Sequence, residues 1–229
     1  MIDAGPPKAA KNVIIPFLRK NGVNKIDLAV LTHAHDDHVG GFPYILENIK
    51  VSEVFDPGVP HTSLAYRRFL TLIGKNNIKY LNPRAGQALS FGDVKVQVLA
   101  PFKHMESNDF NDTSIVLRLV YGNHAFLFTG DAGVRIEDKI LSRGFPLRSD
   151  VLKVGHHGSR FSTGKYFLSK VKPSVAVIPV AAVNRYGHPS PGTIKKLDES
   201  GIKTYRTDIH GAVRIVSDGT DLTVTSAKN

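Results

Sequence analysis

Apolar positions recur along this chain with two different periods, and each period predicts one kind of secondary structure. Recurrence at helical spacing predicts helices over 13–20, 42–49, 63–73, 134–142, 163–171 and 194–199. Strict alternation and short apolar runs predict strands over 26–31, 53–55, 94–98, 115–120, 125–128, 151–154, 175–178, 203–206, 213–216 and 222–225. Because helices and strands alternate without internal repeats, the pattern favours a four-layer α/β fold with two mixed sheets flanked by helices.

The first six residues form an incomplete pattern. Residues 2–6, Ile-Asp-Ala-Gly-Pro, are typical of a buried strand that runs into a Gly-Pro turn, but no earlier strand precedes them to pair with it. We therefore expect an element upstream of this segment to be lacking from the chain.

The densest group of chemically active side chains directly follows the predicted strand 26–31. Within six residues the chain carries His33, His35, Asp37 and His38. His33 and His35 are expected to project to one side because side chains on an extended segment alternate with period two. Asp37 and His38, on the following turn, can reach a second point nearby. Imidazole nitrogens and carboxylate oxygens suit Zn²⁺ or Mn²⁺, and two such ions can activate water and clamp a phosphate.

Two further predicted strand ends carry candidate ligands. Asp131 follows the strand 125–128, where Gly130 lets the backbone approach a ligand closely, so Asp131 is a candidate bridging ligand. Its carboxylate can also cap the helix that begins near residue 134. His156 and His157 follow the strand 151–154. One of them is expected to bind a metal ion and the other to support it, and the spacing does not distinguish them.

The composition narrows the class of protein. A length of 229 residues with 41% hydrophobic content predicts one globular domain over 1–229. With no run of about 18 apolar residues and no charged-then-apolar leader, we expect the isolated chain to be soluble. An excess of 30 Lys and Arg over 20 Asp and Glu favours polyanionic partners. The absence of cysteine excludes disulfides, thiolate nucleophiles and Cys-ligated zinc.

The motif His33-x-His35-x-Asp37-His38, followed by an aspartate and a later histidine after further strands, resembles the metallo-β-lactamase superfamily of hydrolases. Five segments more narrowly resemble the C-terminal domain of ComEC-type competence proteins, the channel for DNA uptake in naturally transformable bacteria. These segments are residues 2–6, 111–114, 127–131, 153–159 and 184–190. The resemblance implies the αββα sandwich, here lacking the first hairpin that normally precedes residues 2–6 in that family.

The resemblance also implies a role for each residue of the histidine motif. His33 and His35 would bind the first ion, and Asp37 and His38 the second. Asp131 would bridge the two ions.

Three other positions complete the implied centre. His156 or His157 would complete the second site, and Asp3 would support the histidine loop by hydrogen bonding without binding metal. The superfamily's usual third histidine of the first site is missing, with His104 as the one weak candidate nearby. A first site short of nitrogen ligands favours two Mn²⁺ ions, with Zn²⁺ as the other possibility.

The expected mechanism and the charge balance predict the substrate contacts. Asp37 is expected to orient or deprotonate the attacking water, and His188 to donate to a phosphate oxygen or to the leaving group. Support of the ligands or contact with phosphate is expected from Asn111, Ser114 and Ser159. Contact with nucleic acid is expected from Arg160, Lys165, Arg185 and Tyr186.

The resulting hypothesis is a metal-dependent nuclease that degrades the non-transported DNA strand during natural transformation. Its partners would be single-stranded or non-specific DNA and the membrane channel portion of the same or a partner protein. It would work as a monomer at the extracytoplasmic face of the bacterial cell membrane. Two alternatives stay open: a hydrolase of small phosphodiesters or lactones that uses the same ions, and a non-catalytic module that binds DNA electrostatically.

Overall fold

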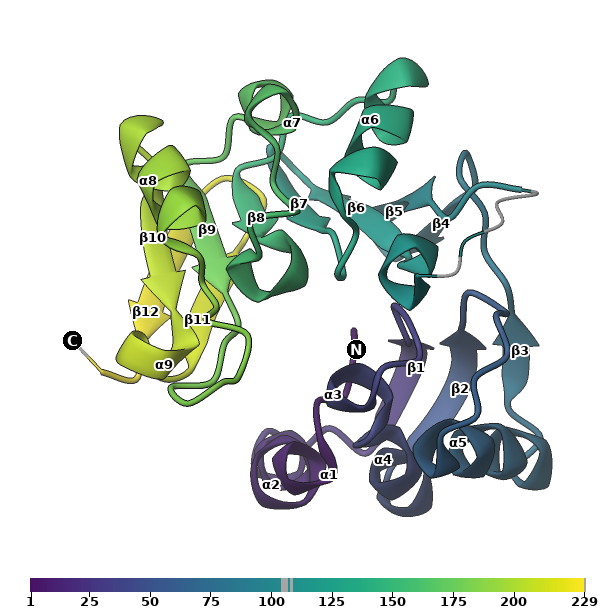
Figure 1. Ribbon diagram of the computed structural model, residues 1–229. Coiled ribbons are helices and arrows are strands. Elements are labelled where there is room, and N and C mark those ends of the chain that lie inside the picture. The colour runs from purple at the N-terminus through teal and green to yellow at the C-terminus, as the bar shows by residue number, and fades with distance from the viewer. Residues whose placement is uncertain (104–106, 108, 229) are drawn as a thin grey trace. The chain divides into compact units, whose positions relative to one another are not determined.

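The structure, a computed structural model, describes residues 1–103, 107 and 109–228. It divides into two compact units (Figure 1). Unit 1 comprises Met1–Pro83 and His104–Ile115, and unit 2 comprises Arg84–Lys103 and Val116–Asn229.

The described part of unit 1 contains a parallel sheet with the strand order β1-β2-β3. Its strands are β1 (Lys25–Val30), β2 (Lys50–Phe55) and β3 (Lys79–Leu81). Helices α3 (Asp36–Val39) and α4 (Phe42–Asn48) connect β1 to β2, and α5 (Leu64–Lys75) connects β2 to β3. These helical crossovers return the chain to the same end of the sheet, so the three strands run in parallel.

The N-terminal residues of unit 1 lie along β1, but residues 2–6 do not form the buried strand that their pattern predicts. Ile2 forms a parallel bridge with Val30, and the N-terminal amine donates to the carbonyl oxygen of Leu28 at 2.7 Å. A helical stretch follows, made of α1 (Pro7–Ala9), a π-helical segment (Ala10–Ile14) and α2 (Ile15–Lys20). It begins earlier than its predicted start at residue 13, because Pro7 occupies the first helical turn, where its missing N–H costs nothing.

The core of unit 1 lies between the sheet and its helices. Phe42 and Ile45 of α4 and Phe69 of α5 are fully buried together with Ala29 of β1 and Val54 of β2. The rings of Phe42 and Phe69 lie 5.1 Å apart and join the two helices. This packing holds the carboxyl end of β1, from which the histidine segment extends.

Unit 2 is built on a mixed sheet, whose order over the described residues is β10-β9-β8-β7-β6-β5-β4. Strands β7 to β10 are parallel, and β4 to β7 are antiparallel. The strands are β4 (Ala88–Phe91), β5 (Val94–Ala100), β6 (Val116–Tyr121), β7 (His124–Phe128), β8 (Val151–Lys153), β9 (Val175–Ile178) and β10 (Lys203–Arg206). Because β7, β8 and β9 are parallel, the segments that follow them emerge at one edge of the sheet.

Helices and a hairpin accompany this sheet. The helices are α6 (Val134–Ser142), α7 (Lys165–Val171), α8 (Pro191–Glu199) and α9 (Thr207–His210), and the hairpin strands are β11 (Val213–Ser217) and β12 (Leu222–Ser226). Apolar residues of the hairpin pack with Val151 of β8, Val175 of β9 and Tyr205 of β10. Short 3-10 turns cover Phe110–Thr113 in unit 1 and Gly155–Gly158 in unit 2. Among the residues described, no helix is both long and apolar enough to cross a bilayer.

Candidate metal centre

The histidine segment of unit 1 leaves β1 in an extended conformation and then turns into α3. Thr32, His33 and His38 are buried, His35 is half-buried, and Asp37 is exposed in the first turn of α3. The ring centroids of His33 and His38 lie 4.1 Å apart, and those of His33 and His35 lie 4.7 Å apart. The segment therefore gathers three imidazoles, as the spacing of the motif predicts.

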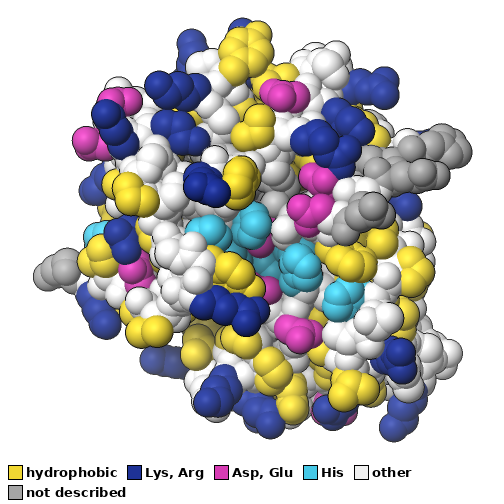
Figure 2. Space-filling view, in the orientation of Figure 1, with side chains coloured by type: hydrophobic (Ala, Val, Ile, Leu, Met, Phe, Trp, Pro, Cys, Tyr) yellow, Lys and Arg dark blue, Asp and Glu magenta, His cyan; other side chains and the backbone are white. Residues whose placement is uncertain are grey.

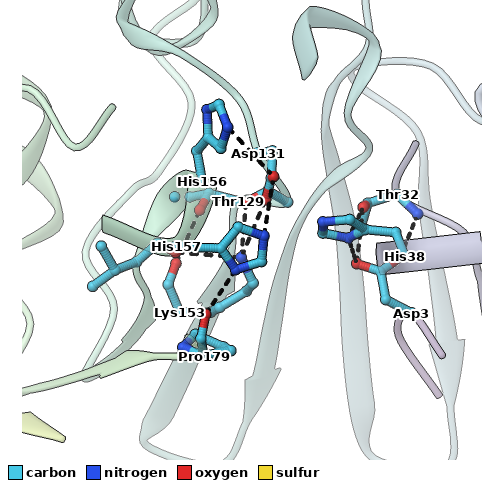
Figure 3. Close-up of polar contacts among 12 residues, drawn as sticks. Asp3, Thr32, His38, Thr129, Asp131, Lys153, His156, His157 and Pro179 are labelled. Carbon is cyan, nitrogen blue, oxygen red and sulfur yellow. Dashed lines mark hydrogen bonds and ion pairs between the residues drawn. The ribbon is translucent and has the colours of Figure 1, made fainter. Parts of the chain in front are cut away.

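Asp3 organises this segment. Its Oδ1 accepts a hydrogen bond from Thr32 N at 2.8 Å, and its Oδ2 accepts from Thr32 Oγ1 at 2.9 Å and from His38 Nδ1 at 2.7 Å (Figure 3). Burial alone would raise the pKa of Asp3, but the neighbouring His38 and the amide of Thr32, which both donate hydrogen bonds to it, outweigh burial and hold the pKa below its usual range. An ionised Asp3 only accepts, so the proton of His38 stays on Nδ1 and its Nε2 is the nitrogen able to bind a metal.

The same network orients His33. Because the Thr32 hydroxyl directs its proton to Asp3, Thr32 Oγ1 accepts from His33 Nδ1 at 3.1 Å. His33 Nε2 then faces Nδ1 of His35 at 3.0 Å. Two nitrogens bound to one tetrahedral zinc ion at about 2.1 Å would lie about 3.4 Å apart. The observed separation is close to that value, so His33 and His35 fit one ion.

The segment 111–114 lies beside the histidine segment within unit 1. The amide of Ile115 donates to Thr32 O at 2.9 Å and ties the two segments together. Ser114 is buried, and its amide donates to Asn111 O at 3.1 Å. Asn111 Oδ1 is buried and has no hydrogen-bond partner in the described part of the chain. His104, the candidate for the missing third histidine, lies outside the described residues.

Sequence reasoning missed His61, which lies close to this group. Its ring centroid is 6.3 Å from that of His35 and 4.6 Å from that of Phe110. Burial lowers the pKa of His61, and the neighbouring His35 lowers it further. One sequence feature could have identified His61, namely its position in the loop after β2. Loops at the carboxyl ends of parallel strands commonly carry site residues.

In unit 2, Asp131 and His157 form the closest pair of candidate ligands. Asp131 is buried just after β7, and its Oδ2 lies 3.4 Å from His157 Nε2 (Figure 3). His157 Nδ1 donates to the carbonyl oxygen of Pro179 at 2.7 Å. Because a carbonyl only accepts, the proton of His157 is on Nδ1, and Nε2 is left as the nitrogen that can bind a metal.

His156 is placed less favourably. Its Nε2 lies 4.0 Å from Asp131 Oδ2, and its ring makes an edge contact with His188 at 5.4 Å between centroids. Both His156 and His157 adopt left-handed backbone conformations, with φ of 46° and 52°. Two consecutive non-glycine residues in this region are costly, and such strain is typical of functional sites.

Lys153 and Ser159 stabilise the segments that carry these ligands. Lys153 Nζ donates to Gly130 O at 2.8 Å and lies 3.7 Å from Asp131 Oδ1. The buried hydroxyl of Ser159 accepts from the amide of Phe161 at 3.3 Å, and its amide donates to His156 O at 2.8 Å. Thr193 Oγ1 of α8 donates to Ser159 O at 3.0 Å, so Ser159 ties its own turn to that helix.

His188 lies in the loop between β9 and α8. Its backbone is held by the side chain of Asn184, which donates to His188 O at 2.8 Å and accepts from His188 N at 2.9 Å. Burial lowers the pKa of His188, and His156 and His157 lower it further. Its Nδ1 is buried and has no hydrogen-bond partner among the residues that the structure describes.

The residues predicted to contact nucleic acid are exposed side chains of unit 2. Tyr186 is 66% exposed and stacks on His188 at 5.8 Å between ring centroids. The guanidinium of Arg185 lies over the Tyr186 ring at 5.0 Å from its centroid. Arg160 lies over the ring of Phe161, and Lys165 begins α7. These four side chains are exposed and therefore accessible to a ligand, and their contact with DNA stays a prediction.

The donor sets fit divalent cations. In each unit, a histidine has its Nδ1 held by an acceptor while Nε2 lies next to other candidate ligands, and this is how metal-binding histidines are usually oriented. Nitrogen and carboxylate donors without thiolates suit Zn²⁺ and Mn²⁺ alike.

The sequence profile of the metallo-beta-lactamase superfamily matches residues 1–182. The chain belongs to this superfamily, and by class it is a metal-dependent hydrolase. The predicted α/β fold, with mixed sheets flanked by helices, is confirmed. The parallel sheet of unit 1 and the mixed sheet of unit 2 are its components.

Among curated proteins the chain is similar to three from bacteria. It is 30% identical over 209 residues to ComE operon protein 3 of Bacillus subtilis, covering 91% of this chain and 27% of the relative. It is 32% identical over 215 residues to competence protein ComA of Neisseria gonorrhoeae, covering 93% and 28%. It is 31% identical over 202 residues to Recombination protein 2 of Haemophilus influenzae, covering 88% and 24%. The chain thus spans about a quarter of the length of these relatives.

Solved structures support the fold. Tm1679, a metal-dependent hydrolase of the beta-lactamase superfamily, is 15% identical with a TM-score of 0.54, over 89% of this chain and 84% of that one. The diiron beta-hydroxylase CmlA from Streptomyces venezuelae is 16% identical with a TM-score of 0.52, over 80% of this chain and 44% of that one.

Proposed function

We propose that this protein is a divalent-metal-dependent phosphodiesterase that hydrolyses DNA. The observation that carries the proposal is the orientation of His38 and His157, whose Nδ1 atoms are held by Asp3 and Pro179. Similarity to a competence protein and to a recombination protein favours DNA as the substrate. A net charge of +10 suits a polyanion.

The proposal treats residues 1–229 as one metallo-β-lactamase-like domain. The proposed ligands are His33, His35, Asp37, His38, Asp131 and His157. His157 is preferred to His156 because its Nδ1 is held and its Nε2 lies nearer to Asp131. Mn²⁺ is the preferred ion, since the first site is short of nitrogen ligands.

The side chains of the protein have separate tasks in the proposed reaction. When bound, a pair of divalent ions makes water easier to deprotonate and neutralises charge on a phosphate. Asp37, exposed at the start of α3, holds the attacking water and accepts its proton. His188, kept neutral by its lowered pKa, donates a hydrogen bond to a phosphate oxygen.

The biological setting is proposed from the relatives. Because the chain spans about a quarter of the competence proteins it resembles, the remainder of such a protein would supply a membrane channel. The nuclease would then degrade the strand that is not transported, on the extracytoplasmic side.

Incubation with linear and circular DNA, single- and double-stranded, tests the proposal. Mn²⁺, Mg²⁺, Zn²⁺ or a chelator is added, and products are separated by electrophoresis. We expect cleavage with Mn²⁺ that the chelator abolishes and that Asp37→Ala lowers at least about 100-fold. Asp36→Ala, an exposed neighbour that is not a proposed ligand, should retain activity.

Two results would contradict the proposal. Hydrolysis of a chromogenic phosphodiester without any DNA cleavage would identify a small-substrate hydrolase. Salt-sensitive DNA binding that ignores chelator, without cleavage by any metal, would identify a binding module.

A further inference from the structure

Unit 2 contains a cavity that no part of the metal centre uses. It has a volume of about 240 Å³ and is lined by Ala85, Phe102, Lys103, Arg143 and Phe145. Phe102 and Lys103 follow β5, whereas Arg143 and Phe145 follow α6. The cavity is therefore formed where the end of a strand meets the end of a helix.

The lining combines aromatic rings with positive charge. The rings of Phe102 and Phe145 are half-buried, and the guanidinium of Arg143 lies over the Phe102 ring at 5.6 Å from its centroid. Lys103 and Arg143 are exposed at the rim. None of the five described lining residues is acidic. Such a lining suits a ligand that carries both a flat ring and negative charge.

The size of the cavity favours a small planar group. Cavities for drug-sized ligands usually measure about 300–1,000 Å³, so this one has room for one ring system. A larger cavity of about 590 Å³ lies beside α8 and β10, but its walls contain Asp198 and no aromatic ring among the described residues. Of these two cavities, as lined by the described residues, the smaller one has the chemistry of a nucleotide site.

Its position in the sheet also suits a DNA strand. Strands β5 and β7 both pair antiparallel with β6, so they end at the same edge of the sheet. Asp131 follows β7, and Phe102 follows β5. Neighbouring strands are about 4.8 Å apart, so β5 and β7 are about 10 Å apart. At a rise of about 3.4 Å, that distance is about three nucleotides of a stacked strand.

We infer that this cavity is a subsite for single-stranded DNA, in which one base stacks on Phe102 or Phe145 and its phosphate pairs with Arg143 or Lys103. The inference rests on the proposed DNA substrate and extends it by naming where a nucleotide beyond the cleavage point is held. Stacking on phenylalanine is independent of sequence, so the subsite would favour single strands without selecting a base.

Fluorescence anisotropy with oligodeoxythymidylate and with an abasic oligonucleotide of equal length tests this subsite. Chelator is present, so the result does not depend on cleavage. We expect the double variant Phe102→Leu, Phe145→Leu to lose about 10-fold in affinity for oligodeoxythymidylate and nothing for the abasic strand. Arg143→Ala should weaken binding to both strands and reduce the dependence on salt.

Matched controls separate these effects from general damage. Arg214→Ala removes an exposed charge on β11, and Phe17→Leu removes an exposed ring from α2, so both should bind like the wild type. Equal affinity of the double variant and the wild type for oligodeoxythymidylate would overturn the subsite, as would an equal loss on both strands. Arg143 is exposed, so we expect Arg143→Ala to fold. Its binding measurement therefore still tests the contact with phosphate if the double variant does not fold.

The outcomes also distinguish the subsite from the proposed nuclease. If the wild type cleaves DNA and the double variant binds normally, only the subsite is wrong. If base-dependent binding is lost in the double variant but the wild type cleaves no DNA, the subsite stands and the nuclease proposal is wrong.

Discussion

At the scale of single residues, Asp3 is the group on which the histidine segment of unit 1 depends most. Asp3 joins Thr32 and His38 through three hydrogen bonds and adopts a left-handed backbone conformation with φ of 52°. Asparagine tolerates this conformation and preserves the shape of the side chain, but it lacks the charge that holds His38.

We therefore expect Asp3→Asn to fold and to bind Mn²⁺ about 10- to 100-fold more weakly than the wild type. Isothermal titration calorimetry measures this change. Asp27→Asn, which removes an exposed carboxylate from β1, is the matched control. Unchanged affinity in Asp3→Asn would mean that the hydrogen bond to His38 plays no part in metal binding.

The two adjacent histidines of unit 2 give a second comparison at this scale. His157→Ala should reduce the affinity for Mn²⁺ much more than His156→Ala, because only His157 has Nδ1 held by a carbonyl and Nε2 within 3.4 Å of Asp131. Titration of both variants under identical conditions measures the ratio. An equal or larger loss in His156→Ala would show that the assignment is reversed.

The sequence was sufficient to identify His156 and His157 as candidate ligands, but it could not decide which of them binds the metal. The histidines stand side by side after β8, and their separation in space arises from two consecutive left-handed residues. Local propensity argues against that conformation for histidine, so only the surrounding structure can impose it. His61 was missed for a different reason, because it lies alone in the sequence and reaches His35 through the fold.

At the scale of elements, Glu137 links α6 to the loop that precedes α7. Its buried carboxylate accepts from Thr163 N at 2.6 Å and from Gly164 N at 2.8 Å. Thr163 adopts a left-handed conformation with φ of 54°, so these bonds hold a strained turn. Burial raises the pKa of Glu137 to about 7, although the backbone hydrogen bonds and Lys196 oppose the shift.

This shift predicts a dependence of stability on pH. Because the pKa is raised from 4.5 to about 7 on folding, the folded chain holds more protons than the unfolded chain between these values. The contribution is fully present below pH 4.5 and is lost as pH rises through about 7, by roughly 3 kcal/mol in the free energy of unfolding. Urea unfolding of Glu137→Gln should lack this dependence.

Asp93→Asn, which removes an exposed carboxylate from the turn between β4 and β5, is the control and should keep the wild-type profile. If Glu137→Gln and the wild type lose stability in parallel between pH 5 and pH 8, the raised pKa of Glu137 is wrong.

Elements with a buried face were predictable from sequence. Helix α6 and strands β9 and β10 have the bounds that the pattern predicts, and β6 and β7 form the expected hairpin. Strands β3 and β4 were missed because they are short, mostly exposed edge strands of their sheets. Without a buried face, their side chains show no alternation for the sequence to reveal.

At the scale of the whole molecule, the net positive charge does not identify one binding surface. Figure 2 shows Lys and Arg side chains scattered over the visible face, without a single basic stripe. A net charge of +10 therefore attracts DNA in general, while specific contacts must come from particular sites. This distribution explains why composition indicated a polyanionic partner but not where it binds.

The central proposal is that the histidine and aspartate side chains named above bind a pair of divalent ions. Anomalous scattering from crystals soaked with Mn²⁺ tests it most directly. We expect two peaks about 3.5–4 Å apart beside the proposed ligands, which include His33, His35, His38, Asp131 and His157. An anomalous map without a peak beside these residues would contradict it.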